Sequence, residues 1–162
     1  MYFQDESGFS LIPCVPYGWQ YRGQKKFIRS EISQRLNVMG FLSTNHAFKS
    51  MIFQCSVNAD CFIQTIEQLF ATVEKETWIV VDNSPVHTSD TVKQKMKSWT
   101  KRKLHLFFLP PYSPHLNPIE ILWRFIKYYW LPLNAYQSFQ HLVDALELIL
   151  KNIGTTYLIN FA

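Results

Sequence analysis

The chain has 162 residues, of which 48% are hydrophobic and 17% charged, so it suits one folded domain with its own core and not a disordered tail. Its three cysteines, which have no CxxC spacing, predict neither a disulfide framework nor a zinc ribbon, and the lack of a secretory leader or a long apolar run predicts a cytosolic protein. A net charge of +4 is compatible with a polyanionic partner such as nucleic acid.

Apolar periodicity and turn-forming residues divide the chain into strands and helices. β-prone or continuous apolar runs predict strands, whereas apolar residues repeated every three or four positions predict amphipathic helices. In chain order the predicted elements are a strand at 1–4, a hairpin of 36–42 and 50–57, a helix capped by Asn58, a strand at 78–81, a helix through Val92, Met96 and Trp99 capped by Ser89 or Thr88, a strand at 104–109, a helix opening at Asn117 and a helix over 139–153 capped by Ser138.

This order of elements predicts the class of fold. The runs at 78–81 and 104–109 are apolar throughout, as expected for strands covered on both faces. Strands that alternate with helices after an initial hairpin predict a mixed sheet with helices packed on it. We therefore expect an α/β fold of the ribonuclease-H-like type, with a mixed five-stranded sheet and helices on both faces.

Three acidic residues stand at the ends of predicted elements. Asp5 follows the first strand, Asp82 ends the strand at 78–81, and Glu120 lies in the first turn of the helix that opens at Asn117. In open α/β sheets, side chains just beyond strand ends and helix N-termini can meet in space. Carboxylates are ligands for Mg²⁺ or Mn²⁺, and two such ions can activate a nucleophile and stabilise the leaving oxygen of a phosphodiester.

Each acid also has a simpler interpretation. Asp5 equally suits an exposed turn, and Asp82 suits a residue that organises the turn at 83–85. Glu120 at position N3 suits a capping box with Asn117 as the N-cap. Spacing and composition leave these alternatives open, and they lead only to an α/β domain with a candidate acidic metal site.

Long motifs surround the second and third acids. The sequences DNSPVH at 82–87 and LPPYSPHLNPIE at 109–120 closely resemble the DDE endonuclease domain of bacterial insertion-sequence transposases in the mariner superfamily. The resemblance extends to FQDES at 3–7, Gly18-Trp19, Trp123 and Lys127, and so covers nearly the whole chain.

The resemblance implies a site, an activity and partners. The matching acids of the family are metal ligands, which assigns Asp5, Asp82 and Glu120 as the catalytic residues and implies Mg²⁺ or Mn²⁺, with two ions expected. It implies cleavage at transposon ends by metal-activated water and then attack of the freed 3′ hydroxyl on target DNA. Transposon-end and target DNA are the implied partners, with a second copy of the chain or a companion transposase subunit, in the nucleoid of the bacterial cytosol and away from membranes. Asp82→Asn is expected to abolish metal-dependent cleavage and to leave stability little changed or raised, because it relieves repulsion among clustered acids.

Other residues are candidates for accessory roles. Asn83 and His87 are placed either to orient metal-bound water or touch a phosphate, or only to shape the turn. The remaining accessory candidates belong to the Pro-rich loop and the helix start that follows it: Tyr112, Ser113 and Asn117. Basic side chains suit either phosphate contacts or a solvated face. The candidates for DNA binding are Arg22, Lys25, Lys26, Lys93, Lys97, Lys101 and Arg102.

The resemblance also bears on domain organisation. Family members usually carry an N-terminal helix-turn-helix region, whereas this chain begins a few residues before Asp5, so we expect residues 1–162 to form the catalytic domain without that region. Two alternatives are a nuclease of the same fold that cuts DNA or RNA without strand transfer, and a non-catalytic remnant that binds DNA or a partner subunit. The long motif at 109–120 argues against the first, and the presence of all three acids argues against the second.

Overall fold

The computed structural model describes residues 1–14, 21–24, 34–111 and 113–159. Its elements are β1 (Tyr2–Phe9), β2 (Leu36–Ser43), β3 (Phe48–Phe53), α1 (Ala59–Leu69), β4 (Thr77–Val81), α2 (Asp90–Lys101), β5 (Leu104–Phe108), α3 (Ile119–Phe125) and α4 (Phe139–Lys151). A short 3-10 helix, Pro114–Leu116, precedes α3, and a π-helical turn, Ile126–Trp130, and a second 3-10 helix, Leu133–Gln137, lead on to α4.

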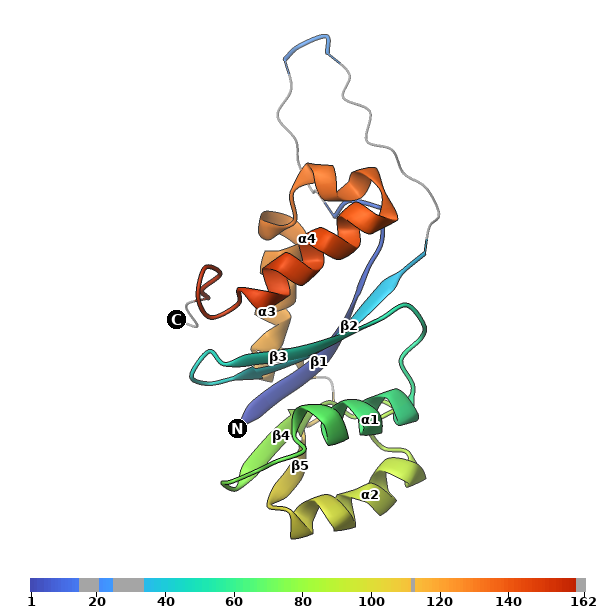
Figure 1. Cartoon of the computed structure of the whole chain (residues 1–162), viewed down its shortest axis with the longest axis vertical. Coiled ribbons are helices and arrows are strands. Elements are labelled where there is room, and N and C mark those ends of the chain that lie inside the picture. The colour runs from blue at the N-terminus through green and yellow to red at the C-terminus, as the bar shows by residue number, and fades with distance from the viewer. Residues whose placement is uncertain (15–20, 25–33, 112, 160–162) are drawn as a thin grey trace.

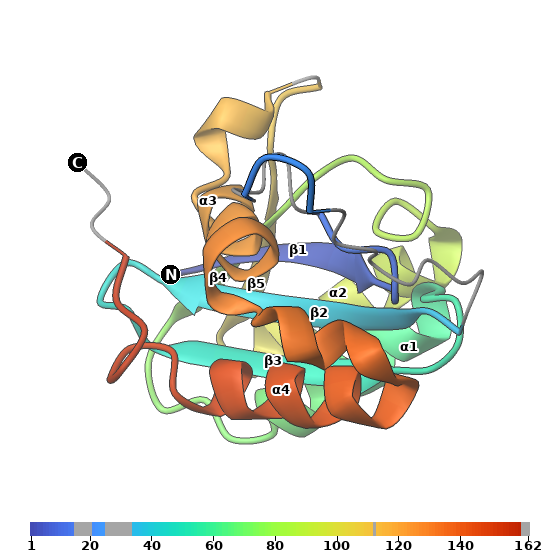
Figure 2. The same cartoon turned by 90° about the horizontal axis from the view of Figure 1, so that it is seen from above.

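The strands form one mixed sheet in the order β3-β2-β1-β4-β5. β1 pairs antiparallel with β2 and parallel with β4, so it lies at the centre of the sheet, and β5 extends the parallel side. Figure 1 shows α1 and α2 on one side of the sheet and α3 and α4 on the other, and Figure 2 shows α4 running alongside the strands of the hairpin. The mixed five-stranded sheet with helices on both faces confirms the predicted architecture.

Two apolar cores form because successive side chains of a strand point to opposite faces. On β2, Val38 packs towards the helices α3 and α4, where Leu122 and Leu146 are fully buried. The neighbouring Met39 packs towards α1 and α2, where it joins Phe62 and other buried side chains. Each helix pair is therefore held to the sheet by its own layer of buried hydrophobic side chains. None of the helices in the described part of the chain is long and apolar enough to cross a membrane.

Gly40 allows α3 to lie close against the sheet. A Cβ atom at this position would stand 2.7 Å from ring atoms of Trp123 and 3.1 Å from Cδ1 of Ile119, closer than packed atoms approach. In the ladder between β1 and β2, Gly40 is the partner of Asp5. The close contact therefore sets the height of α3 above the part of the sheet that carries the first acid.

The first strand is longer than predicted. The sequence predicts a strand at 1–4 that ends before Asp5, whereas β1 continues to Phe9 and pairs with β2 along its whole length. Gly8 favours a loop in sequence, but a paired central strand supplies the hydrogen bonds that a loop would lack, and Phe9 is buried. Asp5 accordingly lies within a strand and not beyond its end. The second hairpin strand also begins and ends earlier than predicted, at Phe48–Phe53.

Candidate active site

The three predicted acids line one pocket. Its volume is about 420 Å³, and Asp5, Asp82 and Glu120 contribute to its wall from β1, from the end of β4 and from the first turn of α3. The remaining lining residues belong to the turn after β4, the loop after β5 and the approach to α3: Asn83, Ser84, Leu109, Pro110, Pro111, Ser113 and Asn117. Residues far apart in sequence thus face one space.

The parallel pairing of β1 with β4 brings the two aspartates level. Phe3 is the partner of Val80, so the residues two positions further along each strand are Asp5 and Asp82. Neighbouring strands lie about 4.8 Å apart, which keeps the two backbones close at this level. The apolar run at the end of β4 is buried, and Asp82 is the first residue beyond it that is exposed.

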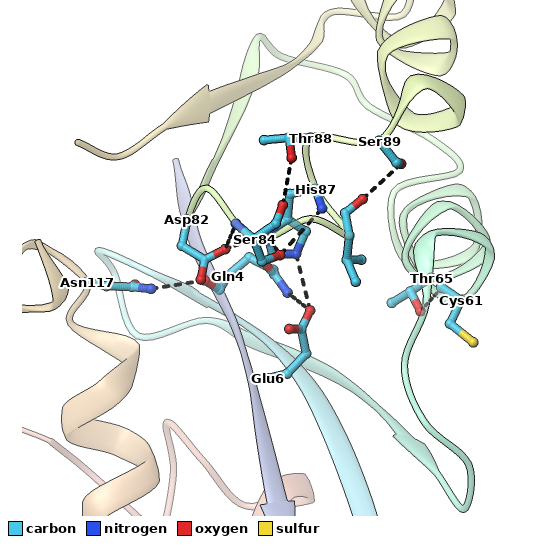
Figure 3. A network of polar contacts seen from close by, with 11 residues as sticks. Gln4, Glu6, Cys61, Thr65, Asp82, Ser84, His87, Thr88, Ser89 and Asn117 are labelled. Atoms are coloured by element: carbon cyan, nitrogen blue, oxygen red, sulfur yellow. Dashed lines mark hydrogen bonds and ion pairs between the residues drawn. The ribbon is translucent and has the colours of Figure 1, made fainter. Parts of the chain in front are cut away.

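Asn117 fixes the start of α3 on the central strand. Its Nδ2 donates a hydrogen bond of 3.1 Å to the backbone oxygen of Gln4, next to Asp5, and the residue is only 4% exposed (Figure 3). The interpretation of Asn117 as a side-chain N-cap is therefore wrong: the cap position is Pro118, and no side chain caps the helix. Glu120 instead contacts Asn117 through the backbone, its N–H donating to the Asn117 carbonyl at 3.1 Å. The amide of Asn117 is used to join α3 to β1, and this leaves Glu120 exposed at the pocket.

Negative charge accumulates in the pocket. Burial first, and then the charges of Glu6, Glu120 and Asp82, raise the pKa of Asp5 to about 7 against the opposing effect of a backbone hydrogen bond at Glu6. A nearby cation stabilises the ionised form of a carboxyl group in such surroundings, and carboxylate oxygens are hard donors that suit a divalent ion. The residues therefore fit the expected metal. Among the described residues, no three His, Cys, Asp or Glu side chains enclose an ion as they lie.

Asp82 has different surroundings from Asp5. A hydrogen bond with His87 lowers the pKa of Asp82, and the backbone N–H of Ser84, which donates at 2.9 Å, lowers it further against the opposing effect of burial. The Asp82 side chain is nevertheless 55% exposed. Asp82 is thus held ionised at the pocket edge, whereas Asp5 is the acid that is costly to ionise.

His87 lies beneath the pocket and not in its wall. The residue is 1% exposed, and its ring stands between Asp82 and Glu6 (Figure 3). Burial, the largest single influence, lowers the pKa of His87, but hydrogen bonds and opposite charges from the two carboxylates outweigh it and raise the pKa to about 9. The sequence leaves two roles open for His87, contact with metal-bound water or phosphate and shaping of the turn, and in the structure its side chain contacts Asp82, Glu6 and Ser84.

The other accessory candidates have structural contacts. The side-chain amide of Asn83 donates to the backbone oxygen of Leu109, which ties the turn after β4 to the loop after β5. Ser113 lines the pocket, and Tyr112 lies outside the described residues. Glu6, which contacts His87, and Gln4, which donates to Glu6, were not predicted as part of the site. Their signal was the period of two along a strand, which turns Glu6 to the face opposite Asp5.

The basic candidates differ in how they are engaged. Arg102 holds α2 to α1, because its Nη1 lies 2.6 Å from Oε2 of Glu67 and its Nη2 donates to the carbonyl of Phe70 at 3.0 Å. Lys93 lies 3.5 Å from Asp90 on the same helix. Lys97 and Lys101 are exposed and form no ion pair within the described part of the chain. Arg22 is exposed, and Lys25 and Lys26 fall outside the described residues.

Sequence comparisons agree with the motifs. Residues 1–143 match the family described as DDE superfamily endonuclease. Over 129 residues the chain is 29% identical to the insertion element IS630 uncharacterized 39 kDa protein of Shigella sonnei, which covers 76% of this chain and 36% of that protein. Over 81 residues it is 36% identical to the transposable element Tcb2 transposase of Caenorhabditis briggsae, which covers 48% of this chain and 28% of that protein. The chain spans about a third of the length of these relatives.

Solved structures share the fold. The Mos1 mariner paired end complex with Mn matches with a TM-score of 0.64 at 13% identity, over 93% of this chain and 47% of that chain. The catalytic core domain of BIV integrase matches with a TM-score of 0.54 at 17% identity, over 77% of this chain and 79% of that chain. These likenesses confirm the ribonuclease-H-like fold that the order of elements predicts. The match over residues 1–143, together with the motifs around Asp82 and Glu120, shows that the chain belongs to the DDE superfamily endonucleases, the family of transposase catalytic domains.

Proposed function

We propose that this domain cleaves DNA phosphodiester bonds at transposon ends, and joins the freed 3′ ends to target DNA, with divalent cations held by Asp5, Asp82 and Glu120. The observation that carries the proposal is the shared pocket, in which acids from three elements face one space and the charges of two of them act on the third. Family membership supports the reaction class. Mn and Mg are named in solved complexes of the fold neighbour Mos1, which supports the choice of ion.

The chain's own residues have separable roles in this proposal. Two Mg²⁺ or Mn²⁺ ions would supply activation of water and stabilisation of the leaving oxygen. Asp82, which is held ionised, would offer a charged ligand at the pocket edge, and a cation beside Asp5 would favour the ionised form of Asp5 by offsetting the negative charge around it. The turn and loop joined by Asn83 keep one wall of the pocket in place while DNA enters.

DNA and a second protein subunit are the proposed partners. Solved structures of the fold neighbour Mos1 include a paired end complex and a strand transfer complex, which supports DNA binding and an assembly of more than one chain. Lys97 and Lys101 are exposed without an ion-pair partner in the described structure, so they are free to contact phosphates. Arg102 is a weaker candidate because its guanidinium already binds Glu67.

Nicking of supercoiled plasmid tests the proposed activity. The parental chain should nick in Mn²⁺ or Mg²⁺ and not in EDTA, and Asp82→Asn should lower the rate by on the order of 100-fold because the amide removes charge that a hard cation needs. The control is Asp90→Asn, which changes a fully solvated aspartate on α2 that lies outside the pocket and should nick at the parental rate. Equal rates for the parent and Asp82→Asn would overturn the metal role.

Joining of a second substrate separates transposition from simple hydrolysis. A duplex oligonucleotide with a free 3′ hydroxyl should become linked to target plasmid in the same buffer if the domain performs strand transfer. Metal-dependent nicking without any joined product, with transposon-end sequence present, would instead support a nuclease of the same fold.

A further inference from the structure

A chain of hydrogen-bonded side chains, of which Gln4 and His87 are buried, connects the pocket to the opposite face of β1. Gln4, Glu6 and His87 lie in this chain, which ends at the carboxylate of Asp82 (Figure 3). Nδ1 of His87 lies 2.7 Å from Oδ1 of Asp82, and Nε2 lies 3.2 Å from Oε1 of Glu6. A carboxylate oxygen only accepts hydrogen bonds, so each ring nitrogen acts as a donor in this arrangement.

The far end of the chain is anchored on the central strand. Oε1 of Glu6 accepts a second hydrogen bond from Nε2 of Gln4 at 2.7 Å, and Gln4 is 1% exposed. Gln4 and Glu6 project from the same face of β1 because they are two residues apart. β1 is paired on both sides in the sheet, so the backbone that carries these two side chains is held in place by β2 and β4.

The ring of His87 has little freedom of its own. It lies against Phe62, with ring centroids 4.6 Å apart, in the core beneath α1. Its backbone N–H donates to the Ser84 carbonyl at 3.1 Å, and the Ser84 hydroxyl lies 3.0 Å from Nδ1. These contacts restrain the ring with its Nδ1 donor facing Asp82.

Two hydrogen bonds hold one of the carboxylate oxygens of Asp82. Oδ1 accepts from both His87 and the Ser84 backbone, whereas Oδ2 takes part in no hydrogen bond within the described part of the chain. The side chain is 55% exposed and lines the pocket, so without those contacts it would rotate freely. Two bonds on Oδ1 therefore restrict the direction in which Oδ2 can point.

We propose that His87 is a positioning residue, which holds Oδ1 of Asp82 through Nδ1, is itself anchored by Glu6 through Nε2, and so keeps Oδ2 of Asp82 directed into the pocket as a metal ligand. This inference rests on the proposed function of Asp82. It gives Glu6 a role distinct from that of its neighbour Asp5: Glu6 supports the histidine from the opposite face of β1 and does not serve as a ligand. Groups that orient metal ligands in this way typically change metal affinity or activity by about 10- to 100-fold when removed.

Two variants separate the two nitrogens of the ring. The amide nitrogen of His87→Asn ends at the δ position, where it can still donate to Asp82, whereas that of His87→Gln ends one atom further, where it can donate to Glu6 instead. Mn²⁺ binding, measured by the paramagnetic resonance signal of free Mn²⁺, should weaken by about tenfold or more in His87→Gln and by clearly less in His87→Asn. Thermal melting in EDTA should be similar for the two variants, because each loses one of the two ring contacts.

The outcomes distinguish this inference from the proposed function. Equal Mn²⁺ affinity in the parent and both variants, or equal losses that follow the melting temperatures, would overturn the positioning role while leaving the parent's nicking intact. If the variants differ in Mn²⁺ affinity as expected but the parent binds Mn²⁺ and never nicks DNA, the positioning role is upheld and the proposed reaction is overturned. Glu6→Ala is an independent arm: it keeps both partners of the Asp82 contact and removes only the anchor, so its Mn²⁺ affinity should fall between those of the parent and His87→Gln.

Discussion

At the residue scale, the two aspartates of the pocket respond to their surroundings in opposite ways. The sequence suggests that removing a charge at Asp82 relieves repulsion, but a hydrogen bond with His87 lowers the pKa of Asp82 and makes its charge favourable. The repulsion falls on Asp5, whose pKa burial and nearby carboxylates raise to about 7. Asp82→Asn should therefore melt slightly below the parent in EDTA, by about 2–4 °C if one hydrogen bond to a charged group is weakened by about 1 kcal/mol.

Asp5→Asn should stabilise the metal-free domain in a pH-dependent manner. The folded-state pKa of about 7 lies above the ordinary value of 3.8, so the folded chain keeps a proton that the unfolded chain releases, and parental stability falls as pH rises between these values. The increase in the free energy of unfolding caused by Asp5→Asn should be close to zero near pH 4 and reach on the order of 1–4 kcal/mol at pH 8. Thermal melting of both proteins in EDTA at the two pH values measures it.

The matched comparison for Asp5 is the same pair of proteins in Mn²⁺. Ion binding to the parent adds stability that Asp5→Asn cannot gain in full, so the difference at pH 8 should shrink or reverse. If Asp5→Asn raised the free energy of unfolding in EDTA by the same amount at both pH values, the assigned repulsion between Asp5 and its neighbouring carboxylates would be contradicted.

At the element scale, contact between α3 and the sheet should be sensitive to the volume at Gly40. Gly40→Ala places a Cβ 2.7 Å from Trp123, so we expect a loss of about 1–3 kcal/mol of stability and a further loss of nicking because α3, which carries Glu120, is displaced. Chemical denaturation and the plasmid assay measure the two effects. Gly8→Ala, in the same strand pair, serves as the control because the atoms nearest to its new Cβ belong to the flexible end of the Arg35 side chain, which can move aside.

A second substitution tests the cause of that loss. Trp123→Phe removes the ring atoms that the new Cβ would meet, so the double variant Gly40→Ala, Trp123→Phe should be more stable than the sum of the two single losses predicts. Strict additivity of the two losses would show that the steric contact is not responsible.

Sequence patterns predicted those elements whose signal is local. The apolar run 78–81 gave β4, and Ser89 and Ser138 cap α2 and α4 through hydrogen bonds from Val92 and His141, because both signals lie within a few residues. The π-helical turn at Ile126–Trp130 was not predicted: it depends on an N–H of Leu131 that bonds to Ile126, five residues back, before Pro132 ends the helix. Nor could spacing reveal the His87–Glu6 contact, which joins residues 81 positions apart and depends on how β1 and the turn after β4 meet.

At the scale of the whole molecule, we expect DNA binding to be governed by phosphate contacts. The net charge is +4, and Lys97 and Lys101 are exposed on α2, so affinity should fall steeply with salt. The double variant Lys97→Ala, Lys101→Ala should reduce the slope of log affinity against log salt by about two. Fluorescence anisotropy with labelled duplex DNA measures the slope.

The control for the salt experiment is Lys151→Ala. Lys151 is also exposed, but it lies at the end of α4, on the opposite side of the sheet from α2 (Figure 1). The slope of log affinity against log salt for Lys151→Ala should equal that of the parent. If the double variant Lys97→Ala, Lys101→Ala also had the parental slope, α2 would be excluded as a phosphate-binding surface.

The central claim is that Asp5, Asp82 and Glu120 together bind the catalytic cation, and anomalous diffraction from crystals of the parental chain grown with Mn²⁺ tests it most directly. The account predicts anomalous density in the pocket, with carboxylate oxygens of all three acids about 2 Å from the ions and with Glu6 still bonded to His87 on the opposite face of β1. Mn²⁺ bound at Glu6 or elsewhere on the surface, with none at Asp5, Asp82 and Glu120, would contradict it.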